Sequence, residues 1–131
     1  QLRKLDRFAQ RRRAIGQRYR AALGDLPWLR LPHDPGAQTV CHHLFVVHMD
    51  FAALGRDRQA VMAELAARGV GTQVHYIPVH TQPWYRETFG TAPGDCPNAE
   101  AHYATCLSLP LFAAMGDGDV ERVVEAVRGL A

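Results

Sequence analysis

Apolar residues recur at helical spacing through the first part of the chain and predict a long amphipathic helix over residues 1–23. The helix ends at Gly24, because glycine commonly follows a helix C-terminus, and Pro27 prevents it from resuming at once. The helical pattern is already under way at Gln1, without a capping residue or an initiator methionine. We therefore expect the chain to be part of a longer protein. The apolar positions that define the helix are Leu2, Leu5, Phe8, Ala9, Ile15, Tyr19, Ala22 and Leu23.

The remaining pattern predicts a small sheet with helices packed on it, which is an α+β fold. Residues 42–49 form the best strand, because they are rich in β-branched and aromatic residues. Their near-continuous apolar middle favours a central strand that is covered on both faces. Gly116 stands where a Ser or Thr cap is expected, which weakens the last helix slightly. The predicted segments are strands at 28–31, 42–49, 71–75 and 107–111, helices at 56–68, 95–106 and 117–130, and a turn at 33–36.

Residues 69–86, with the sequence GVGTQVHYIPVHTQPWYR, concentrate polar and aromatic side chains and form what we call the rim. Pro78 and Pro83 remove backbone donors and fix φ, so we expect an irregular segment after a brief strand. Rings, amides and one guanidinium together suit a polar, ring-shaped ligand that carries hydroxyl and phosphate groups. The alternative is a packed surface loop, in which Trp84 and Tyr85 cover the core and the histidines cap turns. The candidate binding residues are His75, Tyr76, His80, Gln82, Trp84, Tyr85 and Arg86.

Length and composition describe an ordinary globular domain. The chain has 131 residues and a net charge of +2, and one domain is the expectation at this length. No apolar run approaches the ~18 residues of a membrane span. Cys41, Cys96 and Cys106 lack CxxC spacing, which argues against a disulfide framework and fits a reducing cytoplasm. We therefore predict a cytoplasmic protein without a membrane partner.

Positive charge is concentrated in residues 1–30, where nine Lys or Arg residues stand against two Asp residues, and the remainder is net acidic. A basic helix of this kind can bind nucleic acid. A solvated helix face, or an interface with an acidic neighbour, is the simpler interpretation, because no nucleic-acid-binding motif accompanies the arginines.

The familiar patterns of catalytic and metal-binding residues are missing from the sequence. His42 and His43 adjoin on a predicted strand, so they point to opposite faces. His75 and His80 are separated by a proline-bearing turn, and neither HExxH nor CxxC occurs. Ser108, the only serine, lies in an apolar LSLP segment without a surrounding GxSxG. We therefore predict no catalytic, cofactor-binding or metal-binding residue within this chain.

Five blocks of the sequence, taken in order, resemble the C-terminal part of the DegT/DnrJ/EryC1/StrS family. They are QLRKLDRF, RRRAIGQRYRAAL, VGTQVHYIPVHTQPWYR, GDCPNAEAHYATCLSLPLF and DVERVVEAV. Members of this family are nucleotide-sugar aminotransferases that depend on pyridoxal phosphate and have the type I, or aspartate aminotransferase, fold. The resemblance implies that residues 1–131 form a single small domain with a mostly antiparallel sheet. It also implies that residues 1–26 are the helix connecting this domain to an N-terminal cofactor domain, which is missing from the chain.

Two stretches of the sequence, HHLFVVHMDF and VHYIPVHTQPWYR, most resemble one branch of this family. That branch makes 4-amino-4,6-dideoxy sugars for pseudaminic acid and comprises the UDP-4-amino-4,6-dideoxy-N-acetyl-β-L-altrosamine transaminases. The resemblance implies that an amino group passes from a donor such as glutamate to the 4-keto carbon of a UDP-linked deoxysugar. It also implies a homodimer, since this fold usually completes its active sites between subunits.

The resemblance places the cofactor chemistry outside this chain. The family needs a lysine that forms a Schiff base with pyridoxal phosphate. Lys4 is the only lysine, and it lies on the charged side of the first helix, where a lysine is normally solvated. We therefore expect pyridoxal phosphate in the full-length protein, none on this fragment, and no transamination by the fragment alone.

By the same resemblance, the rim contacts the sugar nucleotide at the mouth of the active site. His75 is assigned to binding, because in this family the freed lysine transfers the proton. Two hypotheses of other classes remain open: a non-enzymatic ligand-binding or regulatory α/β module, and a nucleic-acid binder that uses the basic first helix. The candidates rank as His75 and Tyr76 first, donating to sugar hydroxyls or the diphosphate, then His80 and Gln82, then Trp84, Tyr85 and Arg86.

Overall fold

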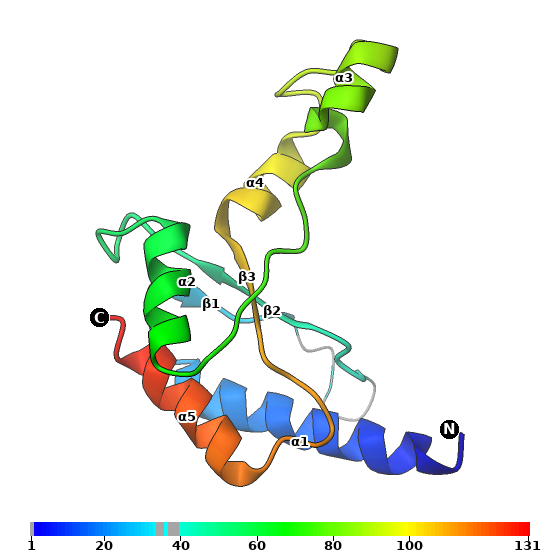
Figure 1. Cartoon of the computed structure of the whole chain (residues 1–131). Coiled ribbons are helices and arrows are strands. Elements are labelled where there is room, and N and C mark those ends of the chain that lie inside the picture. The colour runs from blue at the N-terminus through cyan, green and yellow to red at the C-terminus, as the bar shows by residue number, and fades with distance from the viewer. Residues whose placement is uncertain (1, 34–35, 37–39) are drawn as a thin grey trace.

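A computed structural model describes residues 2–33, 36 and 40–131 and shows the predicted α+β fold (Figure 1). Most of the predicted turn at 33–36 lies outside the described residues. The elements are η1 (Leu2–Lys4), α1 (Leu5–Leu23), β1 (Leu29–Arg30), β2 (Phe45–Met49), α2 (Arg58–Ala67), η2 (Val79–Thr81), α3 (Pro83–Phe89), α4 (Pro97–Thr105), β3 (Cys106–Leu109) and α5 (Asp117–Arg128).

The sheet is antiparallel throughout, in the order β1-β2-β3. Residue Val46 of β2 lies opposite Ser108 of β3. The predicted strand at 71–75 is wrong as a full strand, because it contributes a single bridge between Gln73 and Ser108. Residues 71–75 are all exposed or half-buried, so little apolar packing extends the pairing beyond the bridge.

The two faces of β2 are covered to different degrees. Phe45, Val47 and Met49 are buried, whereas Val46 and His48 between them are half-buried. The prediction that this strand is covered on both faces is therefore wrong for the second face. The apolar residues at 46 and 47 hid the alternation that a half-covered antiparallel strand normally shows.

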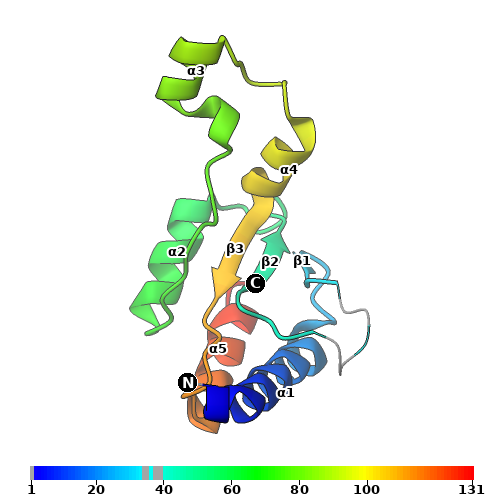
Figure 2. The same ribbon diagram turned by 90° about the vertical axis from the view of Figure 1, so that its right-hand side faces the viewer.

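The core lies between the sheet and helices α1, α2 and α5. Helices α1 and α5 run side by side beneath the sheet (Figures 1 and 2). The rings of Tyr19 and Phe45 meet edge to face with centroids 5.1 Å apart. The Tyr19 hydroxyl donates to the Pro110 carbonyl at 2.8 Å, and burial raises the pKa of this phenol. The first helix is thereby fixed both by apolar packing and by a buried hydrogen bond.

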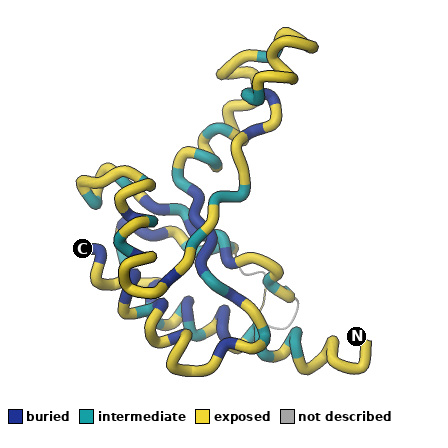
Figure 3. The backbone as a smooth tube through the Cα atoms, in the orientation of Figure 1, coloured by how far each residue is buried: buried dark blue, intermediate teal, exposed yellow. Residues whose placement is uncertain are grey.

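Residues 78–100 project from the sheet as an arm that carries η2, α3 and the start of α4 (Figures 1 and 2). Most of the arm is exposed, in contrast to the buried residues of the sheet (Figure 3). The expectation of an irregular rim is wrong for residues 83–86, which lie in α3. Pro83 occupies the first turn of that helix, where its missing N–H is not needed.

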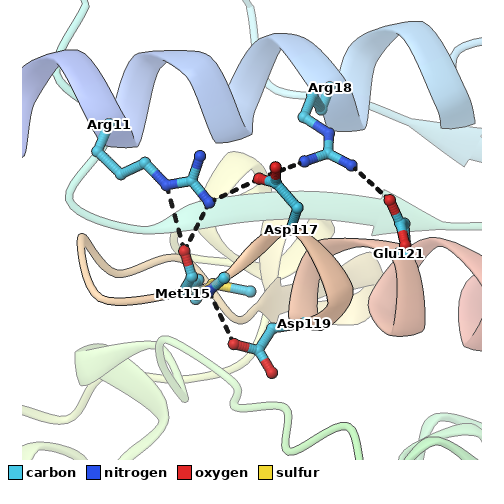
Figure 4. A network of polar contacts seen from close by, with 7 residues as sticks. Arg11, Arg18, Met115, Asp117, Asp119 and Glu121 are labelled. Atoms are coloured by element: carbon cyan, nitrogen blue, oxygen red, sulfur yellow. Dashed lines mark hydrogen bonds and ion pairs between the residues drawn. The ribbon is translucent and has the colours of Figure 1, made fainter.

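Two arginines of α1 face acidic residues of α5 (Figure 4). Arg11 donates to Asp117 Oδ1 at 2.9 Å and to the Met115 carbonyl at 2.6 Å. Arg18 donates to the same Asp117 oxygen at 2.7 Å and to Glu121 Oε1 at 3.1 Å. For these arginines, the acidic neighbour expected as one explanation of the basic helix is α5 itself.

The start of α5 has a cap that compensates for the glycine at position 116. The Gly116 N–H donates to Asp119 Oδ2 at 2.8 Å. Asp117 and Asp119 also place negative charge in the first turn, where the helix dipole favours it. The weakening expected from Gly116 is therefore partly offset by its own helix.

The Asp117 network predicts a pH-dependent contribution to stability. Hydrogen bonding from Arg11, with the charge of Arg18, lowers the pKa of Asp117 in the folded protein. A carboxyl with a lowered folded-state pKa stabilises the fold above its unfolded-state pKa, and this effect disappears as pH falls through the folded-state value. We expect Asp117→Asn to lower the melting temperature at neutral pH and to match the wild type in acid.

The matched control for this measurement is Glu125→Gln on the same helix. Glu125 makes no ion pair among the residues that the structure describes. Thermal unfolding of the three proteins across the acidic range measures the difference. A loss of stability in Asp117→Asn that stays constant from neutral to acid pH would contradict this role of the ionised carboxylate.

Candidate functional site

His75 and Tyr76 lie where the rim leaves the sheet. Their rings meet edge to face, with centroids 4.6 Å apart, and the peptide bond between them is cis. Tyr76 is 74% exposed, and His75 is half-buried. The two first-ranked candidates therefore form a pair, in which one ring is largely open to solvent.

The sheet holds the His75 side chain through Ser108. His75 Nδ1 lies 2.8 Å from Ser108 Oγ. The Ser108 N–H donates to the Gln73 carbonyl at 2.8 Å, and the Gln73 N–H donates back to the Ser108 carbonyl at 3.3 Å. Strand pairing thus positions the histidine. The sequence showed no sign of this role, because Ser108 lies in an apolar segment and belongs to no nucleophile motif.

His80 is buried inside the arm. Its Nε2 lies 2.7 Å from Glu100 Oε1, and the same oxygen accepts the Gly94 N–H at 2.7 Å. The hydrogen bonds from His80 and then Gly94 lower the pKa of Glu100. The Thr91 hydroxyl also donates to the His80 carbonyl at 2.7 Å. This geometry makes His80 a link between η2 and α4, and sequence pattern alone gave no sign of its partner.

The aromatic residues of α3 form an exposed cluster. The Trp84 ring meets those of Tyr85 and Phe89 edge to face, at 5.0 and 5.5 Å between centroids. Trp84 is 59% exposed and Phe89 63% exposed. The alternative that Trp84 and Tyr85 cover the core is therefore wrong. Phe89 was missed, because its helical spacing from these residues has meaning only once α3 is recognised.

Gln82 directly precedes α3, and Arg86 lies within this helix, which forms the tip of the arm in Figure 1. The Arg86 N–H donates to the Gln82 carbonyl at 3.1 Å. Arg86 is exposed and lines a shallow hollow of about 440 Å³ with Pro83, Glu87, Gly90 and Thr91. The structure thus separates the candidates into the His75–Tyr76 pair at the sheet and a second group on the arm.

A second hollow, of about 560 Å³, lies beside β1 and β2 and includes none of the rim candidates. Trp28, Arg30 and Thr105 contribute to its lining. His48 also lines it, with Nδ1 2.8 Å from Thr105 Oγ, and burial followed by the charge of Arg30 lowers the pKa of His48. The hollow is mainly apolar, so we keep the rim, with its polar donors, as the candidate site.

The residues of this chain do not fit a Schiff-base site for pyridoxal phosphate. Lys4 is exposed in η1, without the burial that would depress the pKa of a reactive lysine.

The three cysteines are free, and only Cys106 is buried. Across the described residues, no group of three metal-ligating side chains gathers in one place. No described helix is long and apolar enough to cross a membrane.

This architecture is similar to about one third of the chain in solved sugar aminotransferases. PseC of Helicobacter pylori, an aminotransferase involved in the biosynthesis of pseudoaminic acid, superposes with a TM-score of 0.84 and 25% identity over 99% of this chain and 34% of its own. DesI, solved in the presence of its TDP-sugar product, superposes with a TM-score of 0.83 and 32% sequence identity. That match covers 97% of this chain and 32% of DesI. The fold is thus the α+β fold of a part of type I pyridoxal-phosphate enzymes.

The sequence comparison identifies the family. The chain belongs to the DegT/DnrJ/EryC1/StrS aminotransferase family, which it matches over residues 1–128. The spore coat polysaccharide biosynthesis protein SpsC of Bacillus subtilis (strain 168) is 41% identical over 133 residues, which cover 99% of this chain and 34% of SpsC. The chain therefore spans about one third of the length of the relatives that it matches.

The link between His80 and Glu100 predicts a shared effect on the arm. We expect His80→Ala to speed amide exchange in residues 78–95 by about fivefold, because it removes the hydrogen bond to Glu100. Glu100→Ala should speed exchange at least as much, because it removes that bond and also the acceptor of the Gly94 N–H. The double variant should exchange no faster than the faster single variant. Hydrogen–deuterium exchange with mass spectrometry measures this, and exchange in α1 and α5 should stay unchanged.

Glu87→Gln is the matched control, because Glu87 is an exposed carboxylate of the same arm. It should leave the arm's exchange at the wild-type rate. Additive effects of the two single variants would show that His80 and Glu100 act independently.

Proposed function

We propose that this chain is the C-terminal small domain of a pyridoxal-phosphate-dependent aminotransferase that acts on a 4-keto-6-deoxy UDP-sugar. The observation that carries the proposal is the match of nearly the whole chain, residues 1–128, to one aminotransferase family. The printed roles of PseC and DesI in sugar chemistry support a nucleotide-sugar substrate. The choice of a UDP-linked pseudaminic acid precursor rests on the resemblance in HHLFVVHMDF and VHYIPVHTQPWYR.

The contribution of this chain is substrate placement. Tyr76 presents an exposed hydroxyl, and His75 presents a half-buried ring held by the sheet. Both can donate to a sugar hydroxyl oxygen, or to a diphosphate oxygen, whose negative charge strengthens the hydrogen bond. The arm residues keep their lower rank, because His80 is bound to Glu100 and the group at the tip lies away from the sheet.

The cofactor would be held by the remainder of the protein. When bound, pyridoxal phosphate supplies the electron sink that such amino-group transfer requires. Lys4, the only lysine of this chain, is exposed and unsuited to hold it. By the same proposal, glutamate is the donor, the full-length protein is a cytoplasmic homodimer, and these residues alone do not transaminate.

The proposal is tested by incubating the full-length protein with pyridoxal phosphate, glutamate and a 4-keto-6-deoxy UDP-sugar. We expect an amino sugar and 2-oxoglutarate in equal amounts, measured by mass spectrometry. A cofactor-loaded protein that aminates only a TDP-sugar would overturn the UDP assignment alone. A protein that binds no cofactor and consumes no keto sugar would overturn the transaminase proposal.

His75→Ala in the full-length protein tests the binding role of the rim. We expect KM for the sugar nucleotide to rise on the order of tenfold, because a hydrogen bond to an ionised or hydroxyl group is lost. Cofactor absorbance should remain at the wild-type level. His43→Ala, which changes an exposed histidine outside the rim, is the control and should leave KM unchanged. Loss of cofactor in His75→Ala would show that this residue belongs to the cofactor site instead.

Lys4→Ala tests whether the cofactor lies outside this chain. The variant should retain one borohydride-trappable pyridoxal phosphate per full-length subunit, because Lys4 is solvated and carries no such bond. Peptide mass spectrometry after reduction locates the modified lysine. Stoichiometric label on Lys4 in the wild type, and its loss in the variant, would contradict the assignment.

A further inference from the structure

The contact between His75 and Ser108 joins a rim side chain to a buried strand. Ser108 is 6% exposed, and its Oγ lies 2.8 Å from His75 Nδ1. The hydroxyl is therefore removed from bulk water, and its hydrogen needs an acceptor within the protein.

The backbone around this contact is fixed from two sides. Ser108 pairs with Val46 of β2 on one side and with Gln73 on the other. The second pairing includes hydrogen bonds in both directions, at 2.8 and 3.3 Å. Because Gln73 precedes His75 by two residues, the strand that carries the serine also holds the segment that carries the histidine.

The position of the ring proton on neutral His75 follows from the hydrogen-bonding needs of the Ser108 hydroxyl and of His75 Nδ1. Among the residues that the structure describes, Nδ1 is the one hydrogen-bond partner of Ser108 Oγ. If Nδ1 carried the ring proton, it would donate to Oγ, and the buried hydroxyl hydrogen would have no acceptor. The arrangement that satisfies both groups has the hydroxyl donating to Nδ1, with the proton of the neutral ring on Nε2.

We propose that Ser108 is a positioning residue that holds His75 in its Nε2–H form, so that the ring presents a donor to an acceptor oxygen of the ligand. The ligand chemistry that fits is a sugar hydroxyl or diphosphate oxygen, which accepts such a hydrogen bond. This inference rests on the proposed function, because it assumes that His75 contacts the sugar nucleotide. Nε2 has no hydrogen-bond partner in the described part of the chain, which is consistent with that use.

A double-mutant cycle in the full-length holoenzyme tests whether Ser108 acts through His75. We expect Ser108→Ala to raise KM for the 4-keto UDP-sugar by about fivefold, with kcat nearly unchanged. In the His75→Ala background, Ser108→Ala should add no further change. Ser108→Thr, which keeps the hydroxyl, should restore most of the affinity. Cys106→Ala, a small change at another buried position of β3, is the control and should leave KM unchanged.

Nitrogen-15 NMR of the histidine rings measures the tautomer of His75 without substrate. In protein labelled with nitrogen-15 at histidine, the His75 signals, assigned with His75→Ala, should show the Nε2–H form. Ser108→Ala should convert them to a mixture of both neutral forms. An Nδ1–H ring in the wild type would overturn the proposal. So would a rise in KM from Ser108→Ala that is equally large in the His75→Ala background. If His75→Ala keeps the wild-type KM while the wild-type protein shows the Nε2–H form, the binding role is overturned and the tautomer assignment stands.

Discussion

The structure depends on the burial of strand β3 on both of its faces. Leu107 and Leu109 belong to the core above α1 and α5, and all four residues of the strand are buried. Because side chains alternate along a strand, Cys106 and Ser108 point to the opposite face. One short strand therefore closes the hydrophobic core and, through Ser108, supports the histidine of the rim. Core packing and support of the candidate site therefore meet in this one strand.

The arm follows a different physical principle from the body. Its fixed points are polar, namely the contacts of His80 with Glu100 and of Thr91 with the His80 carbonyl. Its aromatic cluster packs on itself and stays outside the core. Local opening of such a segment costs less than opening a packed sheet, because few buried apolar contacts are lost. We therefore expect the body to hold His75 in place even when the arm opens locally.

The sequence predicted the large elements well, because their apolar periodicity is strong. The long first helix and the α+β class follow from patterns that span many residues, whereas an acidic partner of the basic helix was only one of the alternatives that the sequence left open. Helix α3 was missed, because Pro83 suggests a break unless its place in a first helical turn is known. The half-buried face of β2 was not predicted, because the adjacent Val46 and Val47 interrupt the alternation of apolar and polar residues. Contacts between distant residues, such as His75 with Ser108, leave no periodic signal, so the supporting part of the site required the structure.

The family resemblance and the residue pattern contributed different kinds of information. Pattern alone indicated a polar rim and excluded common catalytic motifs, whereas the ordered blocks indicated an aminotransferase family, which residues 1–128 confirm. The roles of the seven candidate residues remain predictions. Their separation into a pair at the sheet and a group on the arm now says which of them can contact one small ligand together.

The most direct measurement is hydrogen–deuterium exchange of the full-length protein in its pyridoxal-phosphate form, with and without the 4-keto UDP-sugar. Without an amino donor the sugar binds but does not turn over, so the exchange reports binding alone. The account predicts slower exchange in residues 73–77 and no change in α5. Protection confined to segments outside the rim, with residues 69–86 unchanged by saturating sugar, would contradict the claim that this chain places the substrate.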